Sequence, residues 1–112
     1  MAYDEDLAER VRELLVAEPD LTERKMFGGL AFLLGDHMTV AVSGSGGLMV
    51  RVERSAAEEL VEGSNAEPVV MRGRPMGGWL LVPVDELATE RELRRWVGIA
   101  TDRVRSLPPK HL

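Results

Sequence analysis

Apolar residues near the amino terminus recur at the spacing of an amphipathic helix. In an otherwise charged segment, the positions i, i+4, i+7 and i+8 are taken by Leu7, Val11, Leu14 and Leu15. This spacing places them on one side of a helix. Asp4 or Asp6 can cap its first turn. Glu18–Pro19 ends it, because a residue before proline resists helical geometry.

The following segments change to the two-residue period of β-strands. Met38–Ser43 and Leu48–Glu53 each alternate apolar residues with others, so each predicts a strand with one buried side. Met26–Leu33 is predicted as a strand before them, joined to Met38 by a tight hairpin turn at Gly35–Asp36. Because these connections are too short for crossovers, we expect an antiparallel meander.

The second half of the chain predicts a short helix followed by two strands. Ser55–Glu58 has the sequence of a capping box, and Gly63 can close the helix that this box opens. Pro68–Met71 and Trp79–Val82 are predicted as strands, with a loop over residues 72–78 between them.

A second capping box, Thr89–Glu92, opens the last predicted helix. Its apolar positions are Leu93, Trp96, Val97, Ala100 and Val104. The predicted element order is α-β-β-β-α-β-β-α. We therefore expect an α+β fold with a single antiparallel sheet of about five strands.

Composition indicates one globular domain over residues 1–112, with a core of about 4–105 and a tail of 106–112. The chain is 45% hydrophobic and 29% charged, which is ordinary for a globular protein. It has no cysteine, and no apolar run approaches the ~20 residues that span a bilayer. The first residues are acidic, unlike a secretory signal. We expect a cytoplasmic protein that does not engage membranes.

Two runs, Met26–Leu33 and Gly73–Val82, each set a glycine pair beside large apolar side chains. Such pairs mark a bulge or a close approach of another backbone. With Arg24–Gly29, Leu48–Val52, Pro75–Trp79 and the last helix, the chain resembles the TfoX/Sxy N-terminal-domain family over roughly Asp4–Arg105.

The resemblance implies a small domain with helices packed on one antiparallel sheet, of a kind also found in type III secretion chaperones. Founders of the family regulate natural competence and act with other proteins at promoters. They carry a second, carboxy-terminal domain, whereas the resemblance here covers the N-terminal domain alone, so we expect a stand-alone copy. The resemblance brings no catalytic residue with it.

A small anion or nucleotide site is one functional hypothesis. Guanidinium groups and glycine-rich backbone suit phosphate or carboxylate recognition. If the two glycine pairs lie close together, one cleft would be surrounded by Arg24, Lys25, Gly28, Gly29, Arg51, Arg72 and Arg74. Alternatively, Arg51 is an outward strand residue paired with an acid and residues 72–74 are a solvated turn. The glycine spacing does not match phosphate-loop or dinucleotide fingerprints.

Catalytic chemistry finds little support in the sequence. His37 falls in a predicted turn and His111 is the penultimate residue, so neither has the partners of a general base or a metal ligand set. The serines occupy turn or cap positions. We expect no enzymatic activity, no catalytic residue, no metal site and no cofactor.

An interaction surface is the leading hypothesis. Met49 shares the outward side of its strand with Arg51, and methionines line adaptable binding surfaces. A helix or a second subunit could cover this side. On the last helix, one face presents Arg91, Arg94 and Arg95.

We therefore expect a non-enzymatic regulatory or protein-interaction module that binds a protein partner or a second copy of itself. The alternatives are an anion or nucleotide sensor and a transcription-associated DNA-binding accessory that uses the last helix. A net charge of −5 with only two lysines argues against direct binding of nucleic acid.

Overall fold

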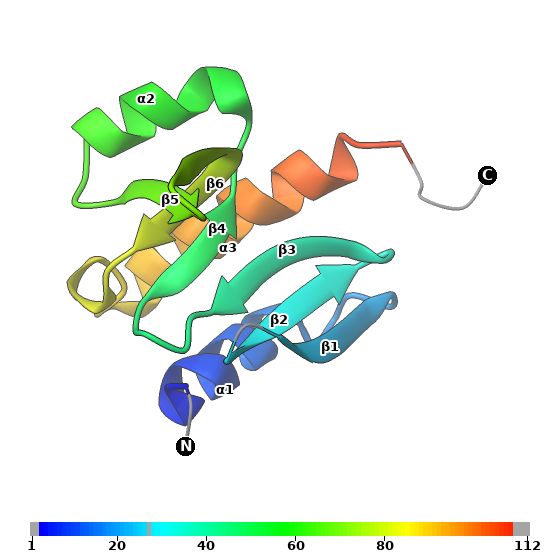
Figure 1. The fold of residues 1–112 in the computed structure, drawn as a ribbon. Helices are drawn as coiled ribbons and strands as arrows, with labels where there is room; N and C mark the ends of the chain where they lie inside the picture. The colour runs from blue at the N-terminus through cyan, green and yellow to red at the C-terminus, as the bar shows by residue number, and fades with distance from the viewer. Residues whose placement is uncertain (1–2, 27, 109–112) are drawn as a thin grey trace.

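The computed structural model describes residues 3–26 and 28–108, which form one antiparallel sheet with helices packed on one of its faces (Figure 1). The first half contains α1 (Glu5–Leu15), β1 (Leu21–Met26), β2 (Gly29–Leu34), β3 (His37–Val42) and β4 (Leu48–Arg51). The second half contains α2 (Arg54–Glu62), β5 (Glu67–Met71), β6 (Arg74–Val82), a 3-10 turn (Val84–Glu86) and α3 (Glu90–Arg105). The predicted α+β class and the single antiparallel sheet are confirmed.

Among the described residues the sheet has six strands, in the order β1-β2-β3-β4-β6-β5. The sequence prediction of about five strands omits β1. This strand lies at the sheet edge, and its residues Thr22–Lys25 are all exposed. A strand with polar residues on both sides shows no alternation, so only its backbone pairing with β2 identifies it.

Two predicted boundaries are corrected by the structure. Met26 ends β1 and Gly29 begins β2, so the predicted strand Met26–Leu33 crosses a turn; Phe27 lies outside the described residues. The predicted loop over 72–78 is only a two-residue turn, because β6 already begins at Arg74. Arg72 and Gly73 form this turn with positive φ of 53° and 76°, as tight hairpins require.

The helix ends follow their capping residues, with one exception. Asp4 Oδ1 accepts a hydrogen bond from Leu7 N at 3.0 Å, and Thr89 and Glu92 form the predicted capping box. The box predicted at Ser55–Glu58 does not form. Because α2 begins at Arg54 with Glu53 as its N-cap, two residues earlier than the box predicts, Ser55 lies inside the first turn and cannot cap it.

The main core lies between the sheet and the helices. Leu7, Val11 and Leu15 of α1 are buried there, as are all five predicted apolar positions of α3. Alternate residues of the central strands, such as Phe32, complete this cluster. We call this side of the sheet the helix face.

Ion pairs hold the carboxyl end of α3 to the segment that follows α1. Arg105 Nη1 lies 2.8 Å from Asp20 Oδ2, and Arg105 Nη2 lies 2.5 Å from Glu18 Oε1. The hydrogen bond from Arg105 lowers the pKa of the Asp20 carboxyl. A carboxyl with a lowered pKa adds stability above its ordinary pKa, and this contribution is lost as the pH falls through the lowered value.

We expect Arg105→Ala to lower the free energy of unfolding by about 0.5–1 kcal/mol at pH 7, since these charges are partly exposed. The difference from wild type should shrink as the pH falls from 7 towards 2, because Asp20 becomes protonated and its ion pair with Arg105 is lost. Urea unfolding across this range measures it. Arg91→Ala, a change at an exposed arginine of the same helix, is the control and should show no such pH dependence.

Candidate functional site

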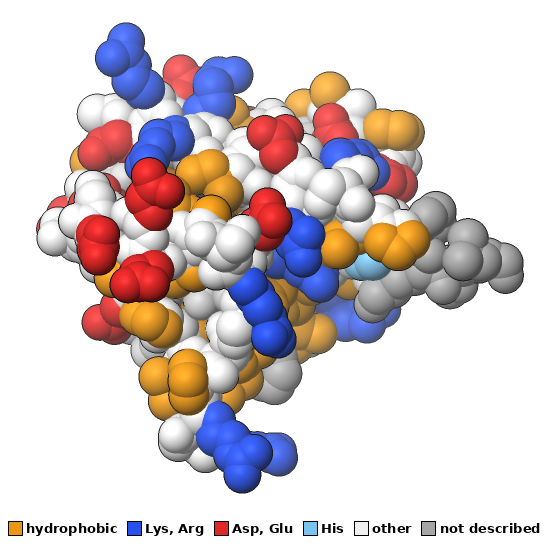
Figure 2. Space-filling model, turned by 90° about the horizontal axis from the view of Figure 1, so that it is seen from above, with side chains coloured by type: hydrophobic (Ala, Val, Ile, Leu, Met, Phe, Trp, Pro, Cys, Tyr) orange, Lys and Arg blue, Asp and Glu red, His pale blue; other side chains and the backbone are white. Residues whose placement is uncertain are grey.

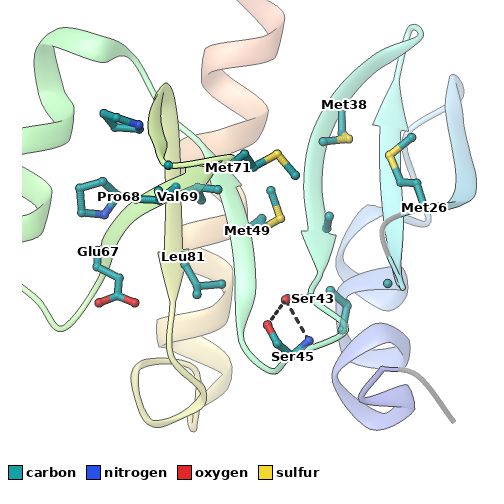
Figure 3. A pocket seen from close by; sticks show the side chains of 16 residues that line it. Met26, Met38, Ser43, Ser45, Met49, Glu67, Pro68, Val69, Met71 and Leu81 are labelled. Atoms are coloured by element: carbon teal, nitrogen blue, oxygen red, sulfur yellow. Dashed lines mark hydrogen bonds between the residues drawn. The ribbon is translucent and has the colours of Figure 1, made fainter.

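The sheet face opposite the helices is an apolar groove of about 720 Å³. Met26, Met38, Met49 and Met71 point into it from β1, β3, β4 and β5 (Figure 3). Leu81 and Ala41 form part of its floor. We call this surface the methionine groove and this side of the sheet the groove face.

Strand alternation explains why the groove is apolar. The residues between the helix-face positions also carry apolar side chains, and Ala31, Leu33 and Ala41 form a second buried cluster with three of the methionines packed against it. The ladder aligns Leu81 with Met49, Met49 with Ala41, and Ala41 with Ala31. Both faces of the central strands are therefore apolar, but only one is covered by helices.

A β-bulge adds Met38 to this surface. Phe32 pairs with Val40 while Leu33 pairs with Met38, so Thr39 is an extra residue in β3. Thr39 is fully buried, and its Oγ1 donates to the carbonyl of His37 at 3.1 Å. Because the bulge shifts the alternation by one residue, Met38 joins Ala41 on the groove face.

The two glycine pairs act as the sequence predicts, as a close approach and a bulge. A Cβ on Gly29 would lie 2.1 Å from the carbonyl oxygen of Val42. The pair Gly77–Gly78 lies in a wide irregularity, where β6 has the four residues 76–79 between its pairings and β5 has only Val69. Gly78 accepts a hydrogen bond from Val52 N at 2.8 Å.

The structure does not bring the two glycine pairs together. Gly29 adjoins Val42 at one end of the strands, whereas Gly78 adjoins Val52 at the other end. Strands β3 and β4 separate them in the sheet. The seven candidate anion-binding residues are thus not arranged around one cleft. Lys25 and Arg24 are also neighbours on a strand, so they project to opposite faces.

Arg51 packs within the protein. Beyond the pairing of Val40 with Val50 the ladder between β3 and β4 ends, and Arg51 Nη1 donates to the carbonyl of Met38 at 3.1 Å. Its guanidinium lies 5.7 Å from the ring centroid of Trp79. Burial, and secondly the charge of Arg103, lower the pKa of Arg51. Arg51 therefore acts as a bridge between strands.

Three other candidate cations surround the methionine groove. Arg24 pairs with Ala31, on the groove face of β1. Arg74 pairs with the groove-lining Met71 across the β5–β6 hairpin, so both lie on this face, and Arg72 lies in the turn between them. All three arginines are exposed, and within the described ranges none has a carboxylate at ion-pair distance. The groove thus has a basic rim, with Glu67 as an acidic lining residue.

The predicted interaction surface is divided between two sides of the molecule. Met49 faces the groove, whereas Arg91, Arg94 and Arg95 are exposed on α3, which packs on the helix face. Arg94 Nη2 lies 3.1 Å from Glu90 Oε1, and the Arg95 guanidinium lies 5.0 Å from the Trp96 ring centroid. These arginines and Met49 cannot contact one partner segment together.

Few polar groups in the groove are free to orient a ligand. Ser43 Oγ and Ser45 Oγ lie 3.0 Å apart, and Ser45 N donates to Ser43 Oγ at 3.2 Å. His37, away from this site, places its Nε2 3.0 Å from the carbonyl oxygen of Pro108, and His111 lies outside the described residues. Nowhere in the described ranges do three His, Asp or Glu side chains gather as around a metal ion.

None of the helices in the described part of the chain has the length and apolarity needed to cross a bilayer. Comparison with curated proteins found no match, and neither did comparison with solved structures. The expected likeness to secretion chaperones thus stays a prediction. A family model, the TfoX N-terminal domain, matches residues 13–103. This match includes the whole sheet and most of α3, so the chain belongs to the TfoX N-terminal domain family.

Proposed function

We propose that the protein is a cytoplasmic, non-enzymatic interaction module that binds a protein partner in the methionine groove. The observation that carries this proposal is the uncovered apolar face, because contiguous apolar surface outside a core marks an interaction site. Protein docking also agrees with the regulatory role, alongside other proteins, that the family resemblance implies.

The chemistry of the groove favours a protein over a small polar ligand. Small-molecule sites combine apolar walls with a few convergent polar groups. Here the hydroxyls of Ser43 and Ser45 hydrogen-bond to each other. The Arg51 guanidinium donates to the Met38 carbonyl and lies over the Trp79 ring. Methionine side chains are flexible and polarizable, so they adapt to the side chains of a partner.

A photo-crosslinking residue at Met49 tests the proposal in cells of the native host. We expect discrete crosslinked products from position 49, because its side chain points into the groove. A crosslinker at Arg91, exposed on the opposite side of the molecule, is the matched control and should give none of these products. Equal labelling from both positions, or none from position 49, would contradict docking in the groove.

Replacing Met49 in the protein used for capture gives a second readout. Met49→Asp places a charge on the apolar floor, so we expect at least a tenfold loss of the captured partner, a free-energy change of about 1.4 kcal/mol. Thermal melting of the variant verifies that it is folded. Retained capture by a folded Met49→Asp protein would place the partner elsewhere.

A further inference from the structure

We infer that the segment bound in the methionine groove is an amphipathic helix of another protein, with carboxylates on both sides of its apolar stripe. This assignment depends on the docking function proposed for the groove. It goes further by naming the secondary structure and the charge of the partner. The residues that carry it are the four methionines and the three arginines of the rim.

The charge of the partner follows from the rim. Arg24 stands on one side of the apolar floor, and Arg72 and Arg74 stand on the other, at the tip of the β5–β6 hairpin. They lie on a chain of net charge −5, so the basic rim differs in sign from the molecule as a whole. Seen from above, acidic side chains gather over α2, while basic and hydrophobic ones mix along the lower edge of the view (Figure 2). Partners meet such rims with opposite charge.

A second copy of this chain is a poor occupant. Two groove faces stacked on each other would oppose the two basic rims, and like charges across an interface cost several kcal/mol. The acidic helix α2 of another copy does not fit either. Its apolar residues Ala57, Leu60 and Val61 already pack on their own core, so its outward side is polar.

The sheet edges are unsuited to pairing with an added strand. At one edge, β1 exposes Thr22–Lys25 to solvent. At the other edge, β5 contains Pro68, which lacks a backbone N–H, and the irregular pairing at Val69. Charges, proline and irregularities at an edge disfavour strand addition. The partner therefore docks on the face of the sheet, where an apolar helix stripe is the matching shape.

The size of the partner segment follows from the sheet. The methionines come from β1, β3, β4 and β5, which reach from one edge of the sheet to the other. Six strands spaced about 4.8 Å apart span about 24 Å. A helix of this length has about 16 residues, or four to five turns. Its apolar residues would repeat every three to four positions to meet the row of methionines.

A displayed library of 16-residue amphipathic helices tests the inference. All members share one apolar stripe, and the positions beside it are randomised among Glu, Asp, Lys, Arg, Gln and Ser. Selection on the wild-type protein should enrich Glu and Asp over Lys and Arg by at least tenfold. Selection on Arg24→Glu/Arg74→Glu, two exposed changes on the rim, should reverse the preference. Met49→Asp should abolish enrichment, and Arg91→Glu, on the other side of the molecule, should leave it unchanged.

The outcomes separate this inference from the docking proposal. Enrichment of basic or neutral residues beside the apolar stripe would overturn the negative charge assigned to the partner. If no library member is enriched on the wild-type protein, the assignment of the partner segment as a helix is wrong. Crosslinks from position 49 in either case would leave docking in the groove intact. Crosslinked products with the mass of two copies of this chain would overturn the inference in favour of self-association. If position 49 gives no crosslinks, the docking proposal itself fails.

Discussion

Replacement of Gly29 by alanine should cost about 3 kcal/mol or more of the free energy of unfolding, a large fraction of the 5–15 kcal/mol that stabilises a typical domain. The added Cβ would lie 2.1 Å from the carbonyl oxygen of Val42 and 3.2 Å from Gly44 N. Both are backbone atoms, so no side-chain rotation relieves the overlap. The strands themselves would have to separate where β2 and β3 pair.

The neighbouring glycine provides a matched control. Gly28 has a positive φ of 74°, but a Cβ there would meet no atom within 4 Å. Gly28→Ala should therefore cost only the strain of a left-handed residue, about 1–2 kcal/mol. Urea unfolding followed by circular dichroism compares the two variants. Equal losses, or a larger loss at Gly28, would show that the close approach to Val42 is not what requires glycine at position 29.

The same stretch shows what the sequence can predict. The pattern of glycines beside apolar residues predicts a bulge or a close approach, and Gly29 and the pair Gly77–Gly78 confirm both. The pattern cannot tell which backbone approaches each pair, because Val42 comes next to Gly29, and Val52 next to Gly78, only when the strands pair. For this reason the expectation that the two glycine pairs form one cleft fails, although each pair is correctly interpreted locally.

Elements with one buried side are predicted well, and elements without one are missed. The apolar positions of α1 and α3 and the alternation in β4 follow from periodicity, since each buries a single face. The alternation in β3 also predicts a strand, but the structure buries both of its sides over residues 39–42. The edge strand β1 has no such periodicity. The first half of β6, Arg74–Gly78, has the composition of a loop, so the sequence predicts this strand only from Trp79 onwards.

The groove is predicted only in part. Alternation places Met49 away from the helix face, so an uncovered apolar surface is foreseeable from one strand. The contribution of Met38 depends on the bulge at Thr39, which has no sequence signal because it arises from how β2 and β3 pair. The basic rim is likewise an effect of pairing, which brings Arg24 and Arg74 to the same surface.

The largest buried side chain gives the other large effect on stability. Trp96 of α3 is only 1% exposed and belongs to the core cluster between the helices and the sheet. Trp96→Ala should lower the free energy of unfolding by about 3–5 kcal/mol, because it removes apolar contact and leaves a cavity that the surrounding strands cannot fill. Circular dichroism is the appropriate probe, since it does not depend on the fluorescence of the deleted indole.

Arg95→Ala distinguishes the core contact from the contact above the ring. The Arg95 guanidinium lies 5.0 Å from the Trp96 ring centroid, and an exposed contact of this kind contributes about 0.5–1 kcal/mol. If Trp96 stabilises the domain by filling the core, its replacement must cost several times more than that of Arg95. A loss below about 1.5 kcal/mol for Trp96→Ala would mean that the sheet closes over the cavity, and α3 would then be held mainly by its smaller residues and its terminal ion pairs.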